Sequence, residues 1–325
     1  MVTAVFEVGA ALLGACVGSF LNVVIHRLPQ EDPAKRSLGG RSRCPHCGVQ
    51  IPWHDNLPVL GWILLRGRGR CCGKPIALRY PAVELLTAGL FLLLALLPPF
   101  GHPPIFAEPD GGYVFAFDAA AAFAFDAVFV ALLVACTFID LDHFILPDRL
   151  TKPGMAIGLC GGLWPGIAGV LGDDPGVALA VRTFLASLAG LLVGGGVTWA
   201  IRIAGSWVFR KEAMGFGDVK FMAMIGAFVG WQGALLTLFL GCVAGAVLGA
   251  ASMLRGGAAK IPFGPYLAIG AVLALFWQRP ILDFLFVTWP AWQRDSTSGP
   301  WILLAVALVS LVLLLVLVRR SRRLG

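Results

Sequence analysis

The sequence predicts an all-α polytopic membrane protein, and its composition is the first reason. Of the 325 residues, 58% are hydrophobic and only 13% are charged, and the mean hydropathy is +0.84. A soluble domain carries about 25% charged residues. The bilayer must therefore solvate most of the chain, and there helices satisfy their own backbone hydrogen bonds. The 41 glycines agree with this, because small residues let membrane helices approach closely.

Apolar runs long enough to form membrane-spanning helices recur along the whole chain. A helix needs about 20 residues to cross the bilayer. Nine runs qualify: 4–25, 81–99, 113–138, 153–171, 177–203, 219–232, 233–254, 263–278 and 300–318. The run 219–232 is short and merges with the next at Trp231-Gln232, so eight spans is the alternative count. We expect the first run to be retained, because it carries Glu7 and lacks the basic start of a secretory signal.

The distribution of Lys and Arg predicts the orientation. Segment 26–80 holds ten basic residues against three acids, whereas loop 100–112 has no Lys or Arg. The positive-inside rule places 26–80 and the basic tail in the cytoplasm and the N-terminus on the opposite side of the membrane. We divide the chain into a first span (1–25), a cysteine-containing cytoplasmic domain (26–80), a transmembrane domain (81–278) and an added span with its basic tail (279–325).

Four of the eight cysteines lie together in the polar segment 26–80. Cys44 and Cys47 form a CxxC pair, and Cys71-Cys72 begins 24 residues after Cys47. In a reducing compartment such a cluster predicts metal binding more than disulfides. Four thiolates can enclose a tetrahedral zinc that would stabilise a loop too small for its own core. The alternatives are a reduced, metal-free cluster and substitution of one thiol by His46 or His54.

Two groups of carboxylates lie where predicted spans meet the cytoplasm. Asp140, Asp142 and Asp148 follow the third span, and Asp218 precedes the sixth. Carboxylates at a membrane edge are costly and mark candidate functional sites. Two of them at close range would share one proton, the chemistry of an aspartic protease. The alternative is a set of solvated loop acids beside basic residues. We expect Asp142 to be a surface acid and Asp148 a cap or support residue.

Asp118 and Asp126 in the third span offer a second hypothesis. They are eight residues apart, hence on one helix face, and Asp126 falls near the bilayer centre. An ion-coupled transporter would use such acids. The alternative is an inward-facing acid paired with Arg182, Arg202 or backbone carbonyls. Glu84, at the start of the second span, would meet a cationic substrate or the loop arginines.

Taken together, these motifs resemble the bacterial type IV prepilin peptidase family of leader peptidases and N-methyltransferases. The matching stretches occur in the family's order over roughly residues 10–275. They are Gly18-Ser19-Phe20-Leu21-Asn22-Val23-Val24-Ile25-His26-Arg27-Leu28-Pro29, Cys44 to Cys47, Ile51-Pro52-Trp53, Asn56-Leu57-Pro58, Leu65-Arg66-Gly67-Arg68, Arg79-Tyr80-Pro81 with Glu84, Asp140 to Asp148, Gly215-Phe216-Gly217-Asp218-Val219-Lys220, and Lys260-Ile261-Pro262-Phe263-Gly264-Pro265.

The resemblance implies that Asp140 and Asp218 are the catalytic pair of an aspartic endopeptidase. It implies supporting roles for Gly215, Gly217, Lys220, Pro147, Asp148 and Glu84. The substrates would be prepilin or pseudopilin precursors in the lipid bilayer, cut after a glycine at the cytoplasmic face. The new N-terminus would then be methylated from S-adenosylmethionine by a function linked to the first cytoplasmic loop. The resemblance leaves open a role in type IV pili or in type II secretion.

The sequence departs from the family in two places. The family's second cysteine pair would fall at positions 69 and 72, but position 69 is Gly69 and the extra thiol is Cys71. The run 300–318 adds a ninth span to a family that typically has eight. Beside the peptidase, the transporter and a zinc-stabilised assembly scaffold stay open as hypotheses. We expect no nucleic-acid partner, because the arginines flank spans, and the sequence leaves the oligomeric state open.

Overall fold

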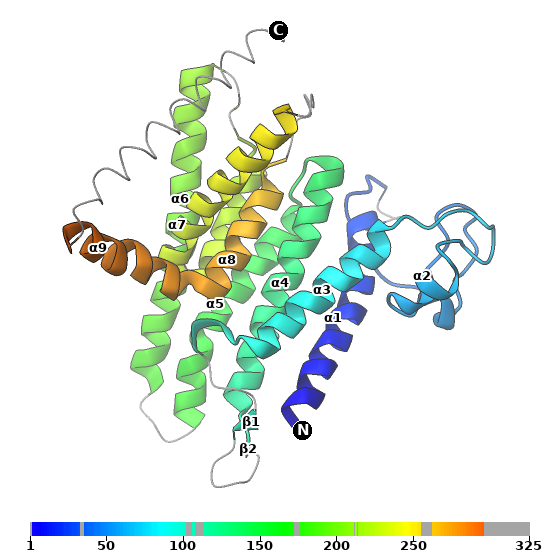
Figure 1. Ribbon diagram of the computed structural model, residues 1–325, viewed down its shortest axis with the longest axis horizontal. Helices are drawn as coiled ribbons and strands as arrows, with labels where there is room; N and C mark the ends of the chain where they lie inside the picture. The colour runs from blue at the N-terminus through cyan, green and yellow to red at the C-terminus, as the bar shows by residue number, and fades with distance from the viewer. Residues whose placement is uncertain are drawn as a thin grey trace.

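The protein is a bundle of long helices with a small loop-rich domain at one side (Figure 1). The computed structural model describes residues 2–32, 36–101, 106–107, 114–171, 176–210, 212, 214–254 and 262–295. Its α-helices are α1 Val2–Arg27, α2 Leu60–Leu64, α3 Arg79–Leu96, α4 Phe117–His143, α5 Asp148–Leu171, α6 Gly176–Phe209, α7 Phe216–Leu254, α8 Gly264–Asp283 and α9 Trp289–Asp295. These bounds confirm the predicted all-α class.

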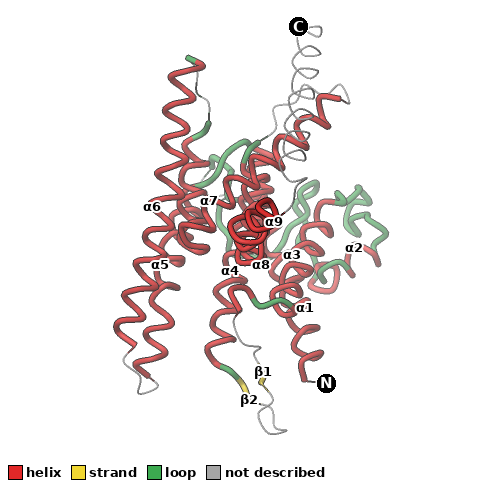
Figure 2. The backbone as a smooth tube through the Cα atoms, turned by 60° about the vertical axis from the view of Figure 1, so that its left-hand side comes forward, coloured by secondary structure: helices red, strands yellow, loops and turns green. Residues whose placement is uncertain are grey.

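Short elements fill the connections. The 3₁₀-helices η1 Trp53–Asn56 and η2 Pro99–Gly101 and the π-helix η3 Phe284–Thr288 join longer helices. Strands β1 Phe106–Ala107 and β2 Val114–Phe115 pair antiparallel before α4. In Figure 2 the helices dominate and loops gather at the ends of the bundle and beside α2.

Six helices of the described residues are long and apolar enough to cross a membrane. They are Thr3–Arg27, Arg79–Leu96, Phe117–His143, Val177–Val208, Phe216–Ser252 and Gly264–Arg294. The helix at the expected span 153–171 is α5, which is not one of the six. The expected span 300–318 and its basic tail lie outside the described residues.

One of the six, α7, is two helices joined at Gly230. Gly230 has φ 75° and ψ 176°, a conformation that favours glycine. A Cβ on Gly194 of α6 would lie 2.5 Å from Met222 O and 3.4 Å from the Ala234 Cβ. A straight helix would separate those two by about 18 Å, so the halves run antiparallel beside α6. The two spans expected at 219–232 and 233–254 therefore meet at Gly230, slightly before the junction read from the sequence.

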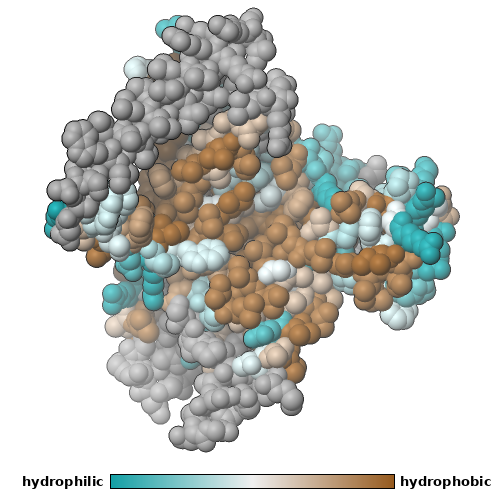
Figure 3. All heavy atoms as spheres, in the orientation of Figure 1, coloured by the Kyte–Doolittle hydropathy of each residue, from teal (hydrophilic) through white to brown (hydrophobic). Residues whose placement is uncertain are grey.

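The apolar core lies between α4, α7 and α8. Its fully buried side chains include Phe129 and Leu133 of α4, Phe221 and Met222 of α7, and Leu267 of α8. A second cluster joins α1, α3 and α4. Many large apolar side chains stay exposed, and Figure 3 shows them as brown surface over the helices. Such a surface suits a bilayer.

Candidate active site

Asp140 lies in the last turn of α4 and is held by the first residue of α8. Its Oδ2 accepts the N–H of Gly264 at 2.9 Å, and its side chain is buried. The first N–H groups of a helix lack partners within the helix and attract negative charge. A Cβ on Gly264 would lie 2.5 Å from Oδ2, so only glycine allows this approach. Asp140 thus has a fixed orientation.

Asp218 lies in the first turn of α7, half-buried, and interacts electrostatically with Asp140 and with the backbone of Gly215. A Cβ on Gly215 would lie 3.5 Å from Asp218 Oδ2, and one on Gly217 would lie 3.1 Å from the Leu146 Cβ. These glycines allow the turn after α4 to approach the start of α7. The fold therefore brings together two acids that are 78 residues apart in the sequence.

Asp148 and Lys220 connect α5 to α7 next to this pair. Lys220 Nζ lies 2.5 Å from Asp148 Oδ1, and Lys152 Nζ lies 2.8 Å from Asp148 Oδ2. Both lysines hold the pKa of Asp148 below its ordinary value, Lys152 most strongly. Pro147, directly before α5, accepts the N–H of Thr151 at 3.2 Å. Asp148 thus begins α5 and joins it to α7, and its supporting role in the site stays a prediction.

Two further acids join the helices to their surroundings. Asp142, expected as a surface acid, is about one-third exposed and forms an ion pair with Arg79 at the start of α3. Glu84 is buried, and its Oε2 accepts the N–H of Val59 at 2.7 Å. Of the two partners considered for Glu84, a cationic substrate and the loop arginines, its contacts among the described residues include no arginine, and a backbone N–H takes that place. Glu84 anchors the cysteine domain to α3.

The four cysteines of the loop domain converge as a tetrahedral metal site requires. Their Sγ atoms all lie within 4.8 Å of one another, with 3.7 Å between Cys44 and Cys72 and 3.3 Å between Cys47 and Cys71. Zinc with Zn–S bonds of about 2.3 Å separates its sulfur ligands by about 3.8 Å. The backbone N–H of His46 lowers the pKa of the Cys44 thiol to about 6. The donor set fits zinc, and the described group includes no histidine.

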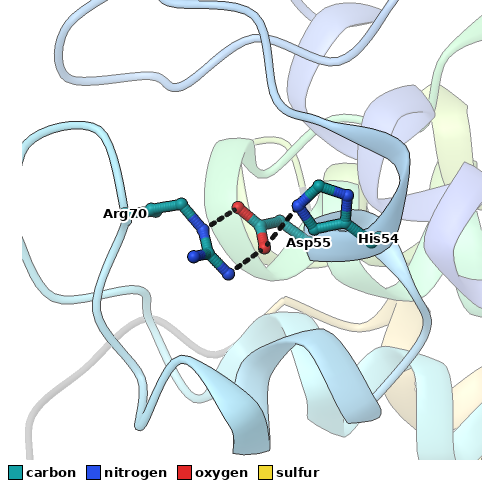
Figure 4. Close-up of polar contacts among 3 residues, drawn as sticks. All are labelled: His54, Asp55 and Arg70. Atoms are coloured by element: carbon teal, nitrogen blue, oxygen red, sulfur yellow. Dashed lines mark hydrogen bonds and ion pairs between the residues drawn. The ribbon is translucent and has the colours of Figure 1, made fainter.

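An ion pair stabilises the domain beside this cluster (Figure 4). Arg70 donates two hydrogen bonds of 2.8 Å to the carboxylate of Asp55, and His54 lies 3.6 Å from the same group. The hydrogen bond from Arg70 lowers the pKa of Asp55. Asp55 lies in η1 and Arg70 precedes Cys71, so the pair joins the two halves of the domain. His54, considered as a zinc ligand, faces Asp55 instead.

The acids of the transporter hypothesis separate in the structure. Asp126 is buried, and its Oδ2 has no hydrogen-bond partner among the described residues, whereas Asp118 in the first turn of α4 is exposed. Asp126 does not pair with Arg202, which donates to Met214 O at 3.0 Å and to Glu212 at 3.1 Å. The two acids of α4 therefore lie in different environments, one buried and one exposed.

Gly264 is the site residue that sequence reasoning missed. It stood in a recognised motif without a role. The sequence contained a signal for this role, because Gly264 followed by Pro265 is typical of the start of a helix. The N–H groups at a helix start are free to bind a negatively charged group. Only the fold shows that Asp140 receives that N–H.

Comparison with known proteins gives matches to two family models and to several relatives. The Bacterial Peptidase A24 N-terminal domain matches residues 12–97, and the Type IV leader peptidase family matches residues 127–250. Among relatives named prepilin leader peptidase/N-methyltransferase, one from Aeromonas hydrophila is 37% identical over 83% of this chain and 90% of its own length. One from Myxococcus xanthus (strain DK1622) is 41% identical over 78% and 65%, respectively. No solved structure gives a significant match. The chain therefore belongs to the type IV leader peptidase family.

Proposed function

We propose that this chain is a membrane aspartyl endopeptidase that removes the leader of type IV prepilin-like precursors, with Asp140 and Asp218 as its catalytic pair. The observation that carries the proposal is the packing of the start of α7 against the segment after α4, where a Cβ on Gly217 would lie 3.1 Å from the Leu146 Cβ. This packing brings Asp218 and Asp140 close enough to interact electrostatically. The names of the relatives supply the substrate class. Prepilin and pseudopilin precursors are both candidates.

The proposed mechanism needs one proton shared by the pair. Two neighbouring carboxylates repel each other when both are ionised, so one of them stays protonated. The ionised carboxylate takes a proton from water, and the protonated one polarises the scissile carbonyl. The Gly264 N–H keeps Asp140 oriented during this step. A precursor whose apolar helix lies in the bilayer would present its cleavage site, after glycine, at the helix ends that carry the pair.

Charge asymmetry supports the location that we propose. The ten basic residues of segment 26–80 favour the cytoplasm for the cysteine domain and for the ends of α4 and α7. The chain would then be a multi-pass protein of the bacterial inner membrane with a periplasmic N-terminus. The four cysteines would hold a structural zinc, whose contribution is to stabilise the small domain.

The relatives' names also support a second activity, N-methylation of the new N-terminus with S-adenosylmethionine as methyl donor. The described cavity beside the cysteine domain, between it and α1, is lined by Arg27 and by no carboxylate. The carboxylate of the donor could pair with Arg27, but its sulfonium and ammonium groups would find no counter-charge there. This cavity does not fit the donor, and we assign it no methyl-transfer step. Transfer of label from a methyl-labelled donor to cleaved substrate would test the activity.

Substitution of each catalytic acid tests the peptidase. In proteoliposomes with a candidate precursor, Asp140→Asn and Asp218→Asn should each slow cleavage by about 10²–10⁴-fold or more, read by mass spectrometry. Asp126→Asn should keep cleavage, which separates the peptidase from a transporter. Folding is checked by thermal unfolding. Wild-type cleavage by a folded variant of either catalytic acid would refute the assignment.

A further inference from the structure

A cavity of about 320 Å³ lies between α1 and the cysteine domain, away from the catalytic pair. Its lining on α1 includes Cys16, Phe20, Val23 and Arg27. These positions are spaced by four, three and four residues, so they form one face of the helix. The cysteine domain covers this face with a segment that includes Ser42 and with residues near η1.

This face of α1 points away from the protein core. On the opposite face, a Cβ on Gly14 would lie 2.8 Å from the Ala88 Cα, and one on Gly18 would lie 2.7 Å from the Glu84 Cα. That opposite face therefore packs directly on α3. Phe20, on the cavity side, is 52% exposed although it belongs to a membrane span. The apolar part of the cavity is consequently open towards lipid.

The cavity also spans the depth over which a lipid changes from acyl chain to headgroup. Cys16 and Arg27 are eleven residues apart, a rise of about 16 Å along α1. This is about half the thickness of the hydrocarbon layer. The end of the cavity nearer the N-terminus of α1 is lined by Cys16, Phe20 and Val23. The end nearer the C-terminus of α1 is lined by Arg27, Ser42 and Asn56. One end suits an acyl chain and the other a polar headgroup.

Arg27 supplies the charge. Its Nη1 donates to Ser37 O at 2.8 Å and to Gly39 O at 3.0 Å, which fixes the guanidinium at the mouth of the cavity. Its Nε and Nη2 have no protein acceptor in the part of the chain that the structure describes. With these donors and no carboxylate in the lining, the cavity selects an anion. Basic pockets at the cytoplasmic side of membrane helices bind anionic headgroups.

The surface around the cavity fits the same ligand. Figure 3 shows apolar surface continuing from the helices onto the nearer part of the cysteine domain, while the far end of the domain is hydrophilic. Trp53 is 73% exposed and Leu64 is 73% exposed on this domain. Exposed Trp beside apolar side chains is typical of a protein surface at the membrane interface.

We propose that this cavity binds one anionic phospholipid, whose phosphate is held by Arg27 and whose acyl chain lies along Cys16, Phe20 and Val23. The lipid would join the cysteine domain to α1 at the membrane surface. The site is independent of the catalytic pair, and its ligand differs from the proposed peptidase substrate.

Native mass spectrometry of the full-length protein in detergent tests the site, with phosphatidylglycerol and phosphatidylcholine as probes. The wild type should bind one phosphatidylglycerol at least about fivefold more tightly than phosphatidylcholine, the preference that one basic residue gives at an anionic surface. Arg27→Ala should abolish the preference, and Arg27→Lys should keep part of it. Arg68→Ala, which removes the same charge from an exposed position of the same domain, should bind as the wild type does.

A second variant protects the test if Arg27→Ala fails to fold. Val23→Trp fills the apolar end and leaves the charge in place, and it should weaken binding of both lipids. Three results would overturn the proposal: unchanged phosphatidylglycerol binding by folded Arg27→Ala, equal binding of soluble glycerol phosphate, or displacement of the lipid by S-adenosylmethionine. The second would assign the cavity to a free phosphate, and the third to the methyl donor.

Discussion

The metal site can be tested by moving one thiol from position 71 to position 69, because Gly69 lies beside the cysteine cluster. A Cβ on Gly69 would lie 3.7 Å from Cys72 Sγ and 4.0 Å from Cys71 Sγ, and its φ lies outside the left-handed region. A cysteine there would reach the cluster without backbone strain. We therefore predict that Cys71→Ser weakens zinc binding and that Gly69→Cys in the same chain restores it.

The expected loss of zinc affinity follows from the number of thiols that converge on the site. Structural zinc contributes about 10–16 kcal/mol through four ligands, so one thiolate is worth roughly 3 kcal/mol, or about a hundredfold in affinity. The assay is chelator competition on detergent-purified protein, with zinc counted by mass spectrometry. Cys160→Ser, in the exposed part of α5, is the control and should bind as the wild type does. Wild-type affinity in Cys71→Ser, or no recovery in the double variant, would refute the geometry.

Three further predictions concern the helices and the domain beside the cluster. Lys220→Met removes the ion pair between α7 and Asp148 of α5. Because the start of α7 then loses its position, kcat for precursor cleavage should fall by about tenfold or more. An unchanged kcat would contradict this prediction. Arg70 lowers the pKa of Asp55, so their pair stabilises the domain at pH values above the ordinary Asp pKa. This stabilisation is lost as the pH falls through the lowered pKa. In Asp55→Asn, the unfolding temperature should therefore fall less steeply with decreasing pH than in the wild type. A Cβ on Gly190 would lie 2.0 Å from Gly226 O, so Gly190→Ala should lower the free energy of unfolding by about 1–3 kcal/mol. Gly196 has open space around it, and Gly196→Ala should leave the free energy of unfolding unchanged in the same assay.

The sequence predicted the helices well because hydropathy over about 20 residues is a local signal. It also predicted a break between two spans near Trp231, and the structure puts it at Gly230, where the positive φ is a backbone property that hydropathy does not reveal. The sequence also left open whether Cys71 and Cys72 join Cys44 and Cys47 at one metal or form a metal-free cluster. In the structure Gly73 N–H donates to Gly69 O at 2.7 Å, and the resulting turn sends the two adjacent thiols to different partners.

What the sequence could not predict are contacts that exist only once distant segments have packed. The hydrogen bond from Gly264 to Asp140 joins residues 124 apart, and no spacing rule connects them. The hydrogen bond between Glu84 and Val59 escaped prediction for the same reason. Charge suggested a cationic substrate or the loop arginines, but the approach of Val59 depends on how the cysteine domain lies against α3.

The first turns of α3 contact both the cysteine domain and the end of α4 that carries the proposed catalytic Asp140. Arg79 forms an ion pair with Asp142, two residues after Asp140, and Glu84 binds Val59 of the cysteine domain. Arg79 and Glu84 are five residues apart, about 140° around the helix, so they face different neighbours. A displacement of the cysteine domain would act on α3 through the buried Glu84 and reach the end of α4 through Arg79. Because the α3 backbone packs directly on Gly14 and Gly18 of α1, this helix has little freedom to move without both contacts changing. The cysteine domain and the proposed catalytic Asp140 are therefore both in contact, directly or through a neighbouring residue, with one helix.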